Sequence, residues 1–127
     1  MPWQFRNDLP IYTQLIAQIQ QRIVSGALLP GERLPSVRDL AAEAGVNPNT
    51  MQRAMMEMER EELVHSLRTA GRFGTQDVER IRRLRESLAR DQVKDFLEGM
   101  FQLGFQLEEI LTFVQTEGEK QREHSGE

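Results

Sequence analysis

The sequence predicts a mainly α-helical protein with one small β-hairpin, and three observations indicate this fold class. Apolar residues recur at steps of three and four along residues 10–25, 36–61 and 77–118, which is the spacing of amphipathic helices. Residues 63–74 instead hold two short apolar runs around a turn, a pattern typical of a hairpin. Glycine or proline stands near the ends of these segments, where helices and strands commonly stop.

The N-terminal part predicts a short arm and a first helix. Trp3-Gln4-Phe5 is an alternating apolar segment that we expect to fold back on the domain as an extended arm; a frayed terminus is the alternative. The helix spans about Pro10 to Ser25, because proline suits a first turn and Gly26 can end the helix. Its apolar face is made of Tyr12, Leu15, Ile16, Ile19 and Ile23.

Two short helices joined by a tight turn are predicted next. Ser36 is a strong N-cap, and Asp39 three residues later makes an Asp version of the capping box. Gly45 ends the first helix, because helices commonly close on a residue with positive φ. Asn47 can cap the second helix, and Pro48 suits its first turn. The inward faces comprise Val37, Leu40, Ala41 and Ala44 in the first helix and Met51, Ala54, Met55 and Met58 in the second.

The second of these helices, about residues 47–61, has the pattern of a DNA recognition helix. Near its N-terminal end it turns Asn49, Gln52 and Arg53 outward, while methionine and alanine face inward. Hydrogen-bonding side chains in front of apolar support are what a helix needs in order to read the major groove.

A β-hairpin follows the recognition helix. Residues 63–67 form its first strand, residues 68–71 its turn, and residues 72–74 return as its second strand. A helix-turn-helix followed by a small hairpin is a winged helix. We therefore expect residues 1–76 to form a winged helix-turn-helix DNA-binding domain.

Residues 77–118 predict two further helices that form a separate region. Gly104 breaks the apolar pattern, and Gln106 with Glu109 makes a start that resembles a capping box. We expect the polar tail, residues 119–127, to be disordered.

The two C-terminal helices carry more apolar residues than two antiparallel helices can bury alone. Their stripe packs either on the winged domain or on a second copy of the chain, and we favour the second copy because closed two-fold pairing is the commonest solution. The predicted dimerisation residues are Leu84, Leu88, Phe96, Leu97, Met100, Phe101, Ile110, Leu111 and Val114.

Composition excludes several classes of protein. The chain has 127 residues, no cysteine and no long apolar run, so we expect a cytoplasmic protein without disulfides or a membrane span. Its net charge is −4, yet residues 1–76 hold eight basic and eight acidic side chains, so the whole excess lies beyond residue 76. We find no nucleophile–base set, phosphate loop or metal-ligand spacing, and His65 and His124 stand apart in sequence. We therefore expect neither an enzyme nor a bound cofactor or metal.

Several motifs resemble the GntR family of bacterial transcriptional regulators. They are Pro10-Ile11-Tyr12, Ser25-Gly26, the run from Leu29 to Ala41, and Val46-Asn47-Pro48-Asn49-Thr50. The resemblance covers residues 10–75, and the remainder is similar in size to the YtrA-type branch. It implies two short helices used for dimerisation and no large effector-binding domain.

Two departures from the family pattern stand out. The family usually has glycine where this chain has Glu62, which must take a helix-compatible or strained conformation. In the wing, Thr69, Arg72 and Gly74 replace the first Gly, the Thr and the Val of Arg-Gly-x-Gly-Thr-Phe-Val. These replacements fall where the resemblance implies a contact between the wing and DNA.

The candidate site residues follow from this pattern and from the resemblance. The resemblance implies that Arg38 contacts DNA; the alternative is a surface arginine paired with Asp39 or Glu43. Gln52 can bond to adenine in two places, or can be a solvated side chain. Arg72 is a candidate for the minor groove. The complete predicted set is Arg33, Ser36, Arg38, Asn47, Asn49, Thr50, Gln52, Arg53, Gly71 and Arg72.

The leading functional hypothesis is a dimeric, sequence-specific repressor that binds double-stranded DNA. Two recognition helices related by a two-fold axis would read a palindrome with half-sites roughly 34 Å apart. The sequence leaves open whether a small-molecule effector is a further partner and does not identify one. The alternative is a protein-interaction module that keeps the winged helix as a scaffold and binds a partner through the acidic C-terminal helices.

Overall fold

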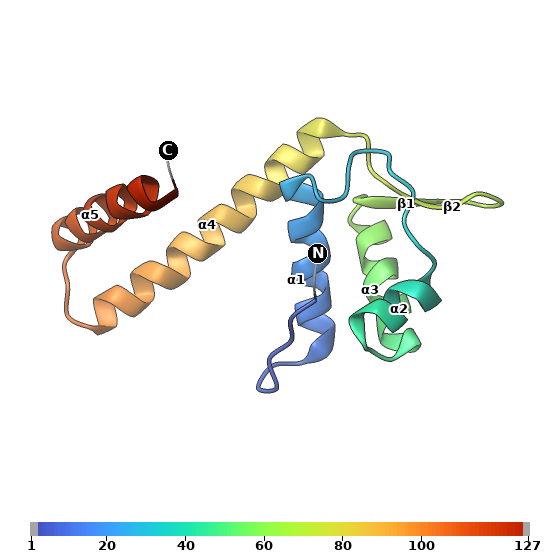
Figure 1. Ribbon diagram of the computed structural model, residues 1–127, viewed down its shortest axis with the longest axis horizontal. Coiled ribbons are helices and arrows are strands. Elements are labelled where there is room, and N and C mark those ends of the chain that lie inside the picture. The colour runs from blue at the N-terminus through green and yellow to red at the C-terminus, as the bar shows by residue number, and fades with distance from the viewer. Residues whose placement is uncertain (1–2, 126–127) are drawn as a thin grey trace. The chain divides into compact units, whose positions relative to one another are not determined.

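The computed structural model describes residues 3–125 and is mainly helical, with one two-stranded hairpin. Residues up to Glu86 form one compact unit and residues from Ser87 form another, so the division falls inside α4. In chain order the elements are α1 Ile11–Ser25, α2 Val37–Ala44, α3 Pro48–Arg60, β1 Val64–Leu67, β2 Gly71–Gly74, α4 Val78–Gln102 and α5 Leu107–Ser125 (Figure 1).

The N-terminal unit is a winged helix-turn-helix, as predicted. Helices α1 and α2 both pack on α3, and β1 follows α3 directly (Figure 1). The methionines of α3 face inward: Met51, Met55 and Met58 are fully buried, which confirms their prediction as core residues. They pack in a core that also contains Leu15, Ile19, Ile23, Leu40, Ala41, Ala54, Leu63 and Val64.

The predicted helix caps set the helix-turn-helix boundaries. The Ser36 side chain accepts a hydrogen bond from the Asp39 backbone N–H (3.1 Å), and Asn47 Oδ1 accepts one from the Asn49 N–H (2.8 Å). Gly45 has φ 72°, the left-handed conformation that ends α2. Because each capped end satisfies backbone groups that the helix leaves open, these few side chains fix where α2 and α3 begin and end.

The N-terminal arm folds back on the domain. The Gln4 N–H donates to Gln18 Oε1 (3.2 Å), and Trp3 Nε1 donates to Glu43 Oε1 on α2 (3.1 Å). The Arg22 guanidinium lies 3.7 Å from the centroid of the Trp3 ring and also pairs with Glu43. The arm therefore connects α1 with α2, and the expectation of an extended arm is correct for the described residues.

The C-terminal unit contains the second part of α4 and all of α5. Gly104 has φ 94° at the turn, and the Gln106 N–H donates to Glu109 Oε1 (3.0 Å), as the capping pattern predicted. Ile110 is 1% exposed, and Phe105 meets Phe113 edge to face with 5.1 Å between ring centroids.

Helix α5 corrects the expectation of a disordered tail. It continues through Gly118 to Ser125, and the last two residues lie outside the described part of the chain. A glycine inside a helix costs only about 1 kcal/mol. Gln115 Nε2 donates to Glu119 (2.7 Å) and Lys120 pairs with Glu117 (3.4 Å), so side-chain pairs span the glycine and offset that cost.

The division between the units also differs from the expected boundary at residue 76. The first turns of α4 belong to the N-terminal unit, where Leu84 is buried (7% exposed). The other eight predicted dimerisation residues lie in the C-terminal unit. Ile110 is buried, Leu88, Leu97 and Met100 are half-buried, and Phe96, Phe101, Leu111 and Val114 are exposed.

Candidate nucleic-acid interface

Helix α3 presents a polar surface opposite its buried methionines. Asn47 and Asn49 are exposed at its N-terminal end, and Thr50 and Gln52 are half-buried one turn later. Their positions follow from the helical period, since the intervening Met51 is fully buried. Each of these four side chains can donate or accept hydrogen bonds, which is the chemistry that reads base edges and phosphates.

A shallow depression joins the start of α2, helix α3 and the wing. Its volume is about 450 Å³, and its described lining contains three arginines and no carboxylate. Six of the ten predicted site residues line it: Arg33, Ser36, Arg38, Gln52, Gly71 and Arg72. The structure thus brings together residues that are separated by up to 39 positions in sequence, from Arg33 to Arg72.

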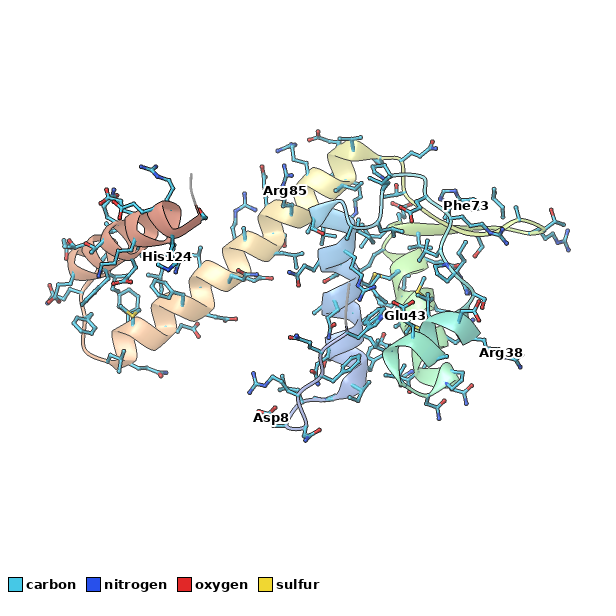
Figure 2. All side chains as sticks on the ribbon, in the orientation of Figure 1. Asp8, Arg38, Glu43, Phe73, Arg85 and His124 are labelled. Atoms are coloured by element: carbon cyan, nitrogen blue, oxygen red, sulfur yellow. The ribbon has the colours of Figure 1, made fainter. Side chains whose placement is uncertain are left out.

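Arg38 is exposed and points away from the domain (Figure 2). The alternative interpretation paired it with Asp39 or Glu43. Within residues 3–125 Arg38 makes no ion pair, whereas Glu43 is engaged by Arg22 (3.9 Å) and by Trp3. The guanidinium of Arg38 is therefore available to an anion outside the protein.

Arg53 lies against the first helix rather than extending freely. Its guanidinium carbon is 4.5 Å from the centroid of the Tyr12 ring, a cation–π contact between α3 and α1. The side chain remains exposed. The contact restricts the side-chain conformations of Arg53.

The wing holds Arg72 in an unexpected place. Arg72 Nε donates to Glu59 Oε1 on α3 (2.7 Å), and the Ser66 hydroxyl donates to the same carboxylate. The hydrogen bond from Ser66 is the largest cause that holds the pKa of Glu59 below its ordinary value of 4.5; burial opposes it, and the hydrogen bond and charge of Arg72 add to the lowering. Arg72 was predicted to enter the minor groove, and that role stays a prediction; here its side chain turns back to the recognition helix.

Gly71 meets a backbone requirement at the end of the hairpin turn. Its φ of 101° lies in the left-handed region, and a Cβ there would lie 3.2 Å from Arg33 Nε. Glycine at this position therefore allows both the turn and the close approach of Arg33. The backbone of Arg33 forms an isolated antiparallel β-bridge with Phe73 on β2 (Phe73 is labelled in Figure 2).

Sequence reasoning missed two residues of this surface. Nothing local in the sequence connects Glu59, near the end of α3, with a strand residue thirteen positions away. Arg68 is exposed in the hairpin turn between β1 and β2. Its place at the tip of a wing was a usable signal, since the tip is the part of a wing that reaches furthest from the domain.

Glu62 is the one non-glycine residue with positive φ between residues 3 and 125, at 62°. It follows α3, where its N–H donates to the Glu59 carbonyl (3.0 Å) and the Leu63 N–H donates to the Met58 carbonyl (2.9 Å). This is the left-handed helix ending that glycine usually occupies. Of the two conformations considered from the sequence, the strained one is present.

Residues 3–125 contain neither a metal-binding cluster nor a helix suited to crossing a membrane. No group of three acidic or histidine side chains is arranged to hold a metal ion there. None of the described helices combines the length and the apolar character that a membrane crossing requires.

Comparison with known proteins identifies relatives across most of the chain. The family model of bacterial regulatory proteins of the gntR family matches residues 11–73. The transcriptional regulator YhcF of Bacillus subtilis is 42% identical over 89% of this chain and 93% of its own length. The transcriptional repressor YtrA of Bacillus subtilis is 31% identical over 86% of this chain and 85% of its own. A GntR family transcriptional regulator of known structure, from Listeria monocytogenes, has a TM-score of 0.82 and 37% identity, over 88% of this chain and 98% of its own.

Proposed function

Because this chain belongs to the GntR family of bacterial transcriptional regulators, we propose that it is a sequence-specific repressor that binds a palindromic operator as a homodimer. Its relative YtrA is a transcriptional repressor, which supports repression as the direction of regulation. In this proposal α3 enters the major groove and the wing approaches the neighbouring minor groove.

The depression between α2, α3 and the wing is the observation that carries the proposal. Arg33 and Arg38, with no carboxylate in the described lining, make a local positive surface on a domain whose total charge is balanced, and the third arginine of the lining, Arg72, is paired with Glu59. Phosphate contacts of this kind position a protein on DNA, and Ser36 lies at the α2 N-terminus, where backbone N–H groups favour an anion. Arg33 and Arg38 flank this point and complete a phosphate site.

Base recognition is assigned to the exposed side of α3. Gln52 faces the depression and has the amide that pairs with adenine through two hydrogen bonds. Arg53, oriented by Tyr12, is suited to guanine or to an adjacent phosphate. Asn49 and Thr50, one turn earlier, contact the backbone or a base edge near the groove entrance.

The C-terminal unit supports the homodimer. Eight large apolar side chains are exposed on its part of α4, the following turn and α5, which is more than a small two-helix unit can leave in water without a partner. They are Val93, Phe96, Phe101, Leu103, Leu107, Leu111, Phe113 and Val114. A second copy of the chain covers this surface with a matching one and places two recognition helices on successive turns of one DNA face.

Two single substitutions test the proposal. The parent protein first selects a DNA duplex from a pool of random sequences, and the affinity of each variant for that duplex is then measured. We expect Arg38→Ala to weaken binding to every duplex and to reduce the dependence of log Kd on log salt by about one. We expect Gln52→Ala to lose about 5- to 150-fold in affinity and to relax preference at one base pair in each half-site.

Arg85→Ala provides the matched control. Arg85 is also exposed but lies on α4, outside the depression (Figure 2). Its removal subtracts the same charge and should leave the salt dependence within a few tenths of the parent value. Equal binding by Arg38→Ala, Gln52→Ala and the parent protein would contradict the proposal and favour the protein-interaction module.

A further inference from the structure

Three side chains connect the recognition helix with both strands of the wing. Glu59 of α3 accepts a hydrogen bond from Arg72 Nε on β2 (2.7 Å) and another from the hydroxyl of Ser66 on β1. The Arg72 and Glu59 side chains are 23% and 30% exposed, so the pair is partly shielded from water. We refer to Glu59, Ser66 and Arg72 as the wing clamp.

The strand register explains why both donors meet one carboxylate. Ser66 and Arg72 are directly opposite each other in the antiparallel hairpin, so their side chains lie on the same face. The next pair, His65 and Phe73, lies on the other face, where the two rings stack 5.9 Å apart. The face that carries Ser66 and Arg72 is therefore the one turned toward α3.

Arg72 also ties the wing to the start of the helix-turn-helix. Its backbone carbonyl accepts a hydrogen bond from the Leu34 N–H (2.9 Å), two residues before the Ser36 cap of α2. One residue thus joins β2 to α3 through its side chain and to the segment before α2 through its backbone. These are the three parts that line the positively charged depression.

We infer that Glu59 is a positioning residue that fixes the wing relative to the recognition helix through Arg72, and that Arg68 is the arginine with which the wing contacts DNA. Because Glu59 neutralises Arg72, the uncompensated positive charge of the hairpin is that of Arg68, which is exposed in the turn. This inference rests on the proposed DNA-binding function and goes beyond it, since it assigns the roles of the two wing arginines.

The competing arrangement has Arg72 leave Glu59 for a phosphate when DNA binds. The two arrangements predict opposite signs for Glu59→Gln. If Glu59 positions the wing, its neutralisation weakens DNA binding although a negative charge is removed, by about 3- to 10-fold. If Glu59 merely competes with phosphate for Arg72, the same substitution strengthens binding.

Salt dependence separates the two wing arginines. In a titration of the parent protein and variants on one duplex, we expect Arg68→Gln to lower the slope of log Kd against log salt by about one. We expect Arg72→Gln to weaken binding with an unchanged slope, because Arg72 releases no counterion from DNA. Each single substitution removes the same contact between Glu59 and Arg72. The double variant Glu59→Gln with Arg72→Gln should therefore bind DNA no more weakly than whichever single variant has the lower affinity.

Glu57→Gln is the matched control for charge. Glu57 lies two residues earlier on α3 and pairs with Arg60 of the same helix, so its neutralisation leaves the wing clamp intact. It should bind DNA as tightly as the parent protein or slightly more tightly. Tighter binding by Glu59→Gln, or a slope reduced by about one in Arg72→Gln, would overturn the inference.

Hydrogen exchange tests the clamp without DNA. We expect Glu59→Gln, but not Glu57→Gln, to accelerate amide exchange in β1 and β2 while leaving α1 and α3 protected. If the parent protein binds no duplex and this exchange result is nevertheless obtained, the proposed function fails while the positioning of the wing stands. Unchanged exchange in the hairpin would overturn the positioning role itself.

Discussion

Substitution of Glu62 by glycine should stabilise the N-terminal unit. Glu62 has φ 62°, and a left-handed conformation costs an L-residue roughly 1–2 kcal/mol. Glycine removes this cost but adds about 0.4–1 kcal/mol of backbone entropy lost on folding. The Glu62 side chain is exposed and makes no hydrogen bond or ion pair with residues 3–125, so its removal breaks no contact. The net expectation is a gain of about 0.5–1 kcal/mol in the free energy of unfolding.

Urea denaturation followed by fluorescence measures this gain. Trp3 is the single tryptophan of the chain and lies on Arg22, so its emission reports on the N-terminal unit. With a denaturant slope of about 1–2 kcal/mol per molar, the midpoint should rise by about 0.25–1 M in Glu62→Gly. Parent and variant are compared at one protein concentration, because dimerisation makes apparent stability concentration-dependent.

Glu62→Ala separates backbone freedom from the loss of the carboxylate. Alanine keeps the cost of positive φ, so this variant should change the midpoint only by the small effect of removing a negative charge beside the C-terminus of α3. A midpoint that is equal or lower in Glu62→Gly than in Glu62→Ala would refute the reasoning from backbone strain.

Three further predictions concern other parts of the chain. Because Ile110 is 1% exposed, Ile110→Ala should lower the free energy of unfolding of the C-terminal unit by about 2–4 kcal/mol, measured by circular dichroism; a loss below about 0.5 kcal/mol would contradict its place in the core. Because the pKa of Glu59 is lowered in the folded state, its stabilising effect is present above pH 4.5 and lost as pH falls through the lowered pKa. The difference in Tm between the parent and Glu59→Gln should therefore be constant from about pH 7 to 5.5 and shrink as the pH falls below 4.5; a difference that stays constant down to the pH of acid unfolding would contradict this. Tyr12→Leu should raise Kd for the selected duplex about 2- to 5-fold by releasing Arg53, whereas in an Arg53→Ala background it should have no further effect.

Local signals made most of the fold predictable. Ser36, Gly45 and Asn47 each act within a few residues of their own position, so their sequence context is enough to place the ends of α2 and α3. The tail was predicted less well for the same reason. Gly118 carries a local signal for a helix end, but the side-chain pairs that span it continue α5 to Ser125.

The candidate site was predictable in composition but not in arrangement. Gln52 was selected from the pattern of the recognition helix, Arg33 and Arg38 were selected from the family resemblance, and all three line one depression in the folded chain. The partner of Arg72 was not predictable, because it depends on which hairpin face turns toward α3. A shift of one residue in register would have directed Arg72 away from Glu59.

Selection of random duplexes by the purified protein, with the mass of the complex recorded alongside, tests dimeric sequence-specific recognition most directly. We expect enrichment of a palindrome whose half-sites lie about one helical turn apart, roughly 34 Å, bound by two copies of the chain. A folded protein that enriches no sequence at low salt would contradict recognition of an operator. A single half-site bound by one copy would contradict the homodimer.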